Sequence, residues 1–122
     1  LYWIGVMMTE QGLEERNIHV NQWFPYQDRE HLPTAEESLM ATLKYLETHN
    51  LDVLHATTAL MIAPSCPIML SKALITNFHQ PKSTLLLLVC AIIGKRWEKA
   101  YAYALAHGFR FLSYGDSCLF IP

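Results

Sequence analysis

Two apolar runs joined by a polar turn form the feature that most constrains the fold, in the stretch ALITNFHQPKSTLLLLV at residues 73–89. The first run predicts a buried strand over residues 68–78, and the second predicts a helix over residues 81–93 that ends near Gly94. Pro81 suits the first turn of that helix because it has no N–H group to leave unpaired. A strand that leads directly into a helix is typical of α/β proteins.

A capping box marks another helix earlier in the chain. Thr34 and Glu37 have the spacing at which each side chain bonds the other's backbone N–H, and Asn50 is a suitable end. The apolar side chains between them are Leu39, Leu43 and Leu46 on one face, with Met40 beside them. This spacing is the pattern of an amphipathic helix.

A third helix is predicted before Gly108. Its apolar stripe repeats at the i, i+3, i+4, i+7 and i+8 positions, which are Trp97, Ala100, Tyr101, Ala104 and Leu105. Such a stripe is far more often part of a core than a platform for stacked bases. Tyr103 and His107 lie on a different face of this helix, and we expect them to be exposed.

The remaining segments are shorter and alternate in character. In chain order they are a helix end or strand at Leu1–Met8, a loop at 9–17, a strand within 19–27 stopped by Pro25, a charged linker at 28–33, an extended segment at 52–62 that ends at Pro64, and two strands joined by a Tyr-Gly-Asp turn at 109–122. Strands that alternate with helices predict an α/β fold with a mixed, partly parallel sheet and flanking helices. No linker divides residues 1–122, which are expected to form a single domain.

Charge and cysteine content limit the functions to be considered. The net charge of -2 gives no overall basic signal for nucleic acid, although a local basic patch stays open. Cys66, Cys90 and Cys118 form no C-x-x-C pair, so we expect reduced, buried thiols in a cytoplasmic protein rather than a zinc site. The longest apolar run, Leu85–Ile93, is about half a membrane span, so no membrane partner is expected.

The hydrophobic fraction is high for a small domain. Hydrophobic residues make up 52% of the chain and charged residues 16%. A free-standing domain usually carries more charge on its surface. One interpretation of this balance is that part of the surface is meant to be covered.

The polar turn has the chemistry of an anion site. At a helix beginning with Pro81, the N–H groups of Lys82, Ser83 and Thr84 would lack partners, and this end carries the positive pole of the helix dipole. A carboxylate or a phosphate fits such an end. The alternative is that these groups only cap the helix, and spacing alone favours capping.

His79 is the residue of this turn that can exchange protons near neutral pH. A catalytic histidine needs a partner that holds its ring, and Asp116 in the closing turn is a candidate. The alternative is that His79 is a surface or capping residue and that Asp116, which follows Gly115, is an ordinary turn residue. No metal site is predicted, because the histidines lack the spacing of metal ligands.

Two strings of this sequence together resemble the C-terminal end of a known enzyme family. TNFHQPKSTL and FRFLSYGD match, in order and separation, the T-N-F-H-x-P-x-S-T-L and Y/F-R-F-x-S-Y-G-D motifs of the S-adenosylmethionine:tRNA ribosyltransferase-isomerases of queuosine biosynthesis. The strong match covers residues 73–121, whereas residues 9–50 do not fit the pattern and read as an insertion. Family members are several times longer. We therefore expect residues 1–122 to be a C-terminal piece of the family's core α/β domain, without its inserted β-barrel domain.

The resemblance implies a reaction and its partners. Such enzymes transfer and isomerise the ribosyl moiety of S-adenosylmethionine onto 7-aminomethyl-7-deazaguanine in tRNA, which gives epoxyqueuosine. S-adenosylmethionine is then a co-substrate, and no metal is required. The implied partners are the anticodon region of tRNA and the remainder of the full-length chain.

The resemblance also implies roles for individual residues. His79 would perform or assist proton transfer, with Asp116 orienting His79 or a hydroxyl group. The residues expected to hold or line the substrate site are Asn77, Phe78, Lys82, Ser83, Thr84, Tyr114 and Gly115. Phe78 would either stack on the substrate or simply pack, and Arg110 would contact tRNA phosphate or face solvent.

The chain alone is expected to be inactive, because the missing domains would supply part of the pocket. One alternative is a remnant that binds RNA or a partner protein without catalysis. Another is a small hydrolase that uses His79 and Asp116, but no nucleophile motif supports it.

Overall fold

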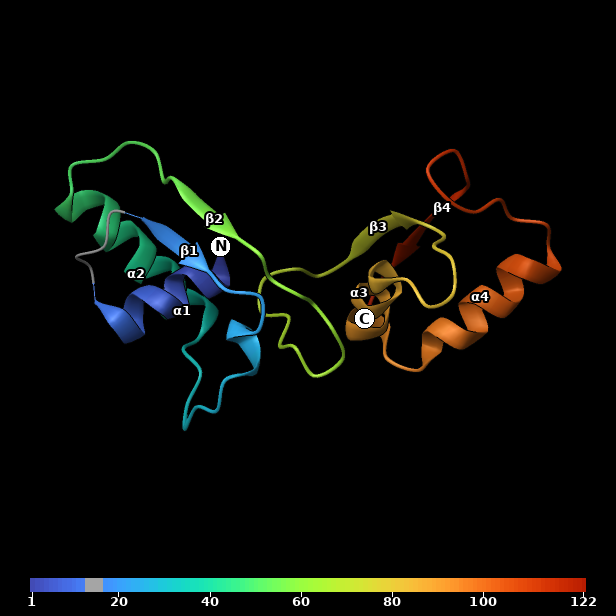
Figure 1. Ribbon diagram of the computed structural model, residues 1–122, viewed down its shortest axis with the longest axis horizontal. Coiled ribbons are helices and arrows are strands. Elements are labelled where there is room, and N and C mark those ends of the chain that lie inside the picture. The colour runs from blue at the N-terminus through green and yellow to red at the C-terminus, as the bar shows by residue number, and fades with distance from the viewer. Residues whose placement is uncertain (13–16) are drawn as a thin grey trace. The chain divides into compact units, whose positions relative to one another are not determined.

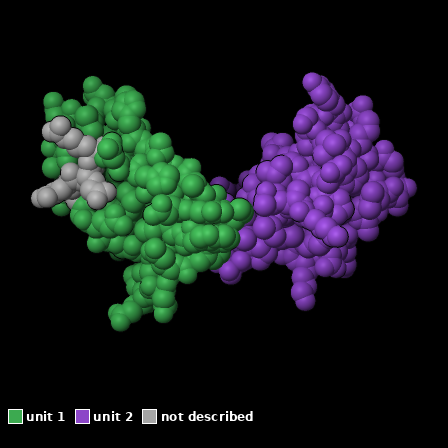
Figure 2. All heavy atoms as spheres, in the orientation of Figure 1, with its two compact units in different colours: residues 1–61 green, residues 62–122 purple. Residues whose placement is uncertain are grey.

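The chain divides into two compact units, which we call unit 1 (residues 1–61) and unit 2 (residues 62–122). The structure is a computed structural model, and it describes residues 1–12 and 17–122. Figure 1 labels its helices and strands, and Figure 2 colours the two units. That the whole chain belongs to one domain of a larger protein stays a prediction.

Unit 1 pairs two helices with a small parallel sheet. Its elements are α1 (Tyr2–Gln11), β1 (Ile18–Val20), the 3-10 helix η1 (Phe24–Tyr26), α2 (Ala35–Thr48) and β2 (Ala56–Thr58). Strands β1 and β2 run parallel, with Ile18 opposite Ala56 and Val20 opposite Thr58. The predicted parallel pairing is therefore confirmed in this unit.

Helix α2 begins and ends as its local sequence predicts. Thr34 Oγ1 accepts from the N–H of Glu37 at 3.2 Å, and the Glu37 carboxylate accepts from the N–H of Thr34 at 2.7 Å. These bonds lower the pKa of Glu37. Past the end of the helix, Asn50 has a φ of 50°, a left-handed conformation that stops the helix.

Helix α2 nevertheless does not pack through its predicted apolar face. The side chains it buries are those of Ser38, Thr42 and Tyr45. Its apolar face is open instead, with exposed fractions of 37% for Leu39, 56% for Met40 and 46% for Leu43.

The reason is a close contact with α1. A Cβ atom added at Gly5 would lie 2.1 Å from the carbonyl oxygen of Ser38, so the two backbones approach too closely for larger side chains. Ser38 Oγ also donates to the carbonyl of Tyr2 at 2.7 Å. At this crossing point α2 therefore presents Ser38 to α1, because a larger side chain would not fit beside Gly5.

Other predicted boundaries in unit 1 differ from the structure. The segment at Leu1–Met8 is a helix that continues to Gln11, so the loop predicted for 9–17 begins too early, and its residues 13–16 lie outside the described part. Pro25 lies inside η1, after a strand of three residues. The extended segment at 52–62 contains only the short strand β2.

Unit 2 packs two helices on an antiparallel pair of strands. Its elements are β3 (Leu74–Asn77), α3 (Thr84–Ile93), α4 (Arg96–Ala106) and β4 (Ser117–Phe120). Leu74 lies opposite Phe120, and Asn77 lies opposite Ser117. The buried core consists of Phe78, Leu86, Val89, Ile93, Tyr101, Ala104 and Phe120.

Several predictions for unit 2 need correction. Strand β3 is four residues long and half covered, since Ile75 is 76% exposed, so the buried strand over 68–78 is wrong. Residues 109–112 form no strand; Leu112 takes a φ of 72°, which an extended strand does not allow. Leu105 is 68% exposed, whereas the exposure predicted for Tyr103 is confirmed at 58%.

Together the units confirm a mixed α/β fold with parallel and antiparallel pairing. The three cysteines are free thiols, and burial raises the pKa of Cys90 and of Cys118. Within residues 1–12 and 17–122, every helix is too short or too polar to cross a membrane.

Candidate functional site

Helix α3 begins at Thr84, three residues later than the sequence predicts. Lys82 has a φ of 66°, so the chain turns there and Pro81 lies before the helix instead of in its first turn. Ser83 is the N-cap, in extended conformation. The unpaired N–H groups at the positive end of the helix dipole therefore begin with Thr84.

The hydroxyl of Ser83 is unusual for an N-cap. It makes no capping hydrogen bond. Its Oγ atom is buried and has no hydrogen-bond partner within the described residues. A buried hydroxyl without a partner costs free energy, so the alternative that these residues only cap the helix does not account for Ser83.

His79 is held at its ring and at its backbone. Its Nε2 atom lies 2.8 Å from Thr76 Oγ1, and its backbone N–H donates to the hydroxyl of Tyr101 at 3.1 Å. Burial raises the pKa of Tyr101, so this phenol stays neutral near physiological pH. The ring of His79 thus has a fixed orientation at the end of β3.

Asn77 binds the closing loop, which we define as residues 109–116. Its Nδ2 atom donates to the carbonyls of Leu112 at 3.0 Å and Ser113 at 3.2 Å. Its Oδ1 atom accepts from Ser117 Oγ at 3.0 Å. With donor and acceptor both engaged, Asn77 positions this loop.

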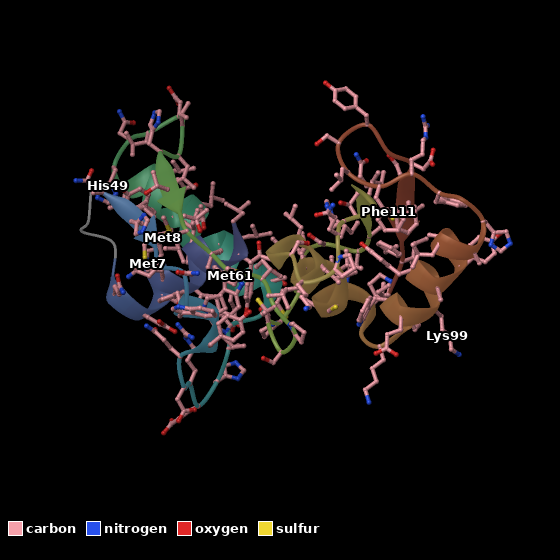
Figure 3. The ribbon with its side chains drawn as sticks, turned by 45° about the vertical axis from the view of Figure 1, so that its right-hand side comes forward. Met7, Met8, His49, Met61, Lys99 and Phe111 are labelled. Carbon is pink, nitrogen blue, oxygen red and sulfur yellow. The ribbon has the colours of Figure 1, made fainter. Side chains whose placement is uncertain are left out.

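Phe78 fastens the other side of the same loop. Its carbonyl accepts from the N–H of Leu112 at 2.9 Å, and its own N–H donates to the carbonyl of Asp116 at 3.4 Å. The side chain is 4% exposed, and its ring contacts those of Tyr101, Phe109 and Phe111. Phe111 is labelled in Figure 3. Of the two expected roles, this geometry favours packing.

Asp116 pairs with Arg110 across the closing loop. Its carboxylate accepts from the backbone N–H of Arg110 at 2.8 Å and from the guanidinium at 3.1 Å. These bonds lower the pKa of Asp116 and raise that of Arg110. The recorded partner of His79 is Thr76, so its predicted pairing with Asp116 stays a prediction. The Arg110 side chain is 74% exposed and remains open to a phosphate.

Gly115 and Tyr114 differ sharply in their surroundings. A Cβ atom at Gly115 would lie 2.4 Å from the carbonyl oxygen of Arg110, so the loop closes only with glycine there. Tyr114 is 95% exposed and projects from the loop.

Pairing of β3 with β4 is what brings the polar turn and the closing loop together. This gathers Asn77, His79, Arg110 and Asp116 at one end of the strand pair, while Lys82 and Thr84 are exposed on the turn. Sequence reasoning missed Thr76, although its place three residues before His79 was a signal. It also missed the hydroxyl of Tyr101 as a partner of His79, because the sequence pattern identified Tyr101 only as a core residue.

A hollow of about 350 Å³ lies elsewhere, in unit 1. It is lined by Tyr45, His49, Leu51 and His55. None of the residues predicted for the site lines it.

Comparison with known proteins extends the match beyond the two strings. Residues 38–120 match the sequence profile of a family described as "Queuosine biosynthesis protein". This range includes most of α2, so the part of 9–50 from residue 38 onward belongs to the family pattern and is not an insertion.

The similar proteins share one name. S-adenosylmethionine:tRNA ribosyltransferase-isomerases from Rhizorhabdus wittichii and Acidiphilium cryptum are 52% and 53% identical over 66 residues. The match takes in 53% of this chain but only 19% of each relative, so the chain spans about a fifth of their length. A solved S-adenosylmethionine tRNA ribosyltransferase from Thermotoga maritima is 28% identical, with a TM-score of 0.48 over 69% of this chain and 38% of that one.

Proposed function

This chain belongs to the queuosine biosynthesis protein family, and we propose on that premise that it is part of an S-adenosylmethionine:tRNA ribosyltransferase-isomerase. The complete enzyme would move and isomerise the ribosyl group onto 7-aminomethyl-7-deazaguanine in tRNA, giving epoxyqueuosine. The observation that carries the proposal is the identity of about half the aligned residues to proteins of that name.

The chain would act as a C-terminal piece of the core α/β domain and be inactive alone. The small share of each relative that it spans supports this. The open apolar face of α2, with Leu39, Met40 and Leu43, supports a partner that covers it. We take that partner to be the remainder of the family's chain.

His79 would perform or assist the proton transfer beside the sulfonium of S-adenosylmethionine. The contact with Thr76 supports this role, because a catalytic histidine needs a fixed ring orientation. If Thr76 Oγ1 accepts from Nε2–H, Nδ1 is left as the basic atom.

The turn and the start of α3 would hold the anionic part of the substrate. Ser83 supports this role through a buried hydroxyl that has no partner among the described residues, and Thr84 supports it as the first residue of the helix, where backbone N–H groups point toward a ligand. Lys82 adds a positive charge. Tyr114 and Gly115 would line the same site from the closing loop.

Asn77 and Asp116 would act by positioning. Asn77 bonds the closing loop from the end of β3, and Asp116 bonds Arg110 within that loop, so together they would hold the loop in place beside His79. Arg110, held by Asp116 yet exposed, would contact a phosphate of the tRNA.

Replacing the residue aligned with His79 by alanine in the full-length Rhizorhabdus wittichii relative tests the proposed role. We expect single-turnover transfer to tRNA to fall about 100-fold or more, in the range for loss of a general base, with S-adenosylmethionine binding retained. Unchanged transfer would show that His79 has no part in the chemistry. The same assay on this chain alone tests whether it is only a part of the enzyme. We expect no transfer, whereas transfer would show that the chain is a catalyst by itself.

A further inference from the structure

Positive charge is concentrated in unit 2, although the whole chain carries a net charge of -2. Residues 62–122 contain six Lys and Arg against two acidic residues, a balance of +4. Residues 1–61 contain three against nine, a balance of -6. The overall charge thus conceals a basic unit that suits a polyanion.

One face of α4 combines a cation with exposed aromatic rings. Lys99, Tyr103 and His107 follow one another at intervals of four residues, which places them on one face. All three are exposed, whereas Tyr101 and Ala104 point into the core. Figure 3 shows Lys99 projecting from α4. In the part of the chain that the structure describes, no carboxylate pairs with Lys99.

The two rings form an ordered stack. The centroids of Tyr103 and His107 lie 3.8 Å apart, at an interplanar angle of 20°. His107 Nδ1 lies 2.8 Å from the carbonyl oxygen of Tyr103 and donates to it, since a carbonyl only accepts. The two side chains are already fixed in one rotamer each, so the ring of a bound ligand can stack on them with little further loss of conformational entropy.

Edge-to-face ring contacts link the stack to the candidate site. Phe109, 36% exposed, contacts the ring of Tyr103 at 6.1 Å and that of Phe78 at 5.5 Å. Phe78 precedes His79, and Arg110 follows Phe109 with its guanidinium exposed. The aromatic face of α4 and the candidate site are therefore parts of one packed cluster.

We infer that Lys99, Tyr103 and His107 form a binding surface for single-stranded RNA. A base stacks on the pair of rings, and Lys99 neutralises a phosphate of the same strand. The choice of RNA over another polyanion rests on the proposed function. The existence of the surface rests on the ring stack and the charge of unit 2.

Binding of the whole chain to a fluorescent single-stranded RNA of about 12 nucleotides tests this, by anisotropy without S-adenosylmethionine. We expect Tyr103→Leu, which keeps an apolar helix former, to weaken binding about tenfold through loss of stacking. Tyr103→Phe keeps the ring and should bind like wild type. Lys99→Gln should weaken binding and reduce the slope of log affinity against log salt by about one.

Two variants serve as matched controls. Leu105→Ala alters an exposed side chain on another face of α4, and Lys44→Gln removes one exposed lysine from α2 in the acidic unit. Both should leave the affinity within about twofold of wild type. Circular dichroism on every variant checks that the fold is retained.

The inference would be overturned by no RNA binding of wild type at about 50 mM salt, by wild-type affinity in Tyr103→Leu, or by an equal loss of affinity in Tyr103→Phe. Equal affinity for duplex and single-stranded RNA would also overturn it, because paired bases cannot join the stack. Binding to phosphatidylserine vesicles but not to RNA would assign the surface to a membrane instead. The assay needs no turnover, so failure of the proposed transferase reaction and failure of this inference are read separately.

Discussion

Helices α2 and α4 have similar amphipathic sequences but use them in opposite ways. Helix α4 buries Tyr101 and Ala104 from its predicted apolar stripe, although Leu105 at the end of the stripe is exposed. Helix α2 exposes Leu39 and Leu43 and instead buries Ser38, Thr42 and Tyr45. Periodicity identifies an apolar face in both helices, but it does not say whether the residues of the same unit cover that face. A neighbour that comes as close as Gly5 selects small residues over apolar ones.

The largest expected effect lies in the core of unit 2, where burial and pattern agree. Phe78→Ala should lower the free energy of unfolding by about 4 kcal/mol, because it removes a fully packed ring and leaves a cavity. Urea unfolding of the whole chain measures this. Leu105→Ala, at a position 68% exposed, is the control and should change stability by less than about 0.5 kcal/mol. Similar losses in both variants would mean that the wrong face of α4 has been assigned to the core.

The next largest effect tests the close contact between Gly5 and Ser38, which decides the face through which α2 packs on α1. Gly5→Ala should cost about 3 kcal/mol, because its Cβ would meet the backbone of Ser38 and separate the two helices. Leu43→Ala, on the open apolar face, should change stability by less than about 0.5 kcal/mol. The same denaturation measurement serves both variants. If Leu43→Ala greatly lowered the free energy of unfolding and Gly5→Ala did not, the leucine face of α2 would have to be the one that packs in the core.

The smallest effect compares the two N-caps. Thr34→Ala should cost about 1 kcal/mol, since it breaks a complete capping box on α2. Ser83→Ala should be neutral or slightly stabilising, because its hydroxyl caps nothing and is buried without a partner within the described residues. Thermal unfolding of the two variants checks the difference. Equal destabilisation would show that Ser83 caps α3 in solution.

The sequence predicted the ends of helices wherever residues of that same helix determine them. The capping box at Thr34 and Glu37 predicted the start of α2, and Gly94 predicted the end of α3. These features depend on residues within one turn of each other, so hydrogen bonding and φ preferences suffice to place them. The two family strings were equally legible, because they are runs of consecutive residues.

Only the tertiary structure decided which side chains meet. The antiparallel register sets Asn77 opposite Ser117, forty positions along the chain, and thereby brings the closing loop to the polar turn. The long-range contacts of that site followed from this packing: Asn77 with the carbonyls of Leu112 and Ser113, and the His79 N–H with the Tyr101 hydroxyl. Residue types and spacing list groups able to bond, but which of them come within about 3 Å depends on pairing between distant segments. For the same reason, the leucines of α2 identify its apolar face but not what covers it.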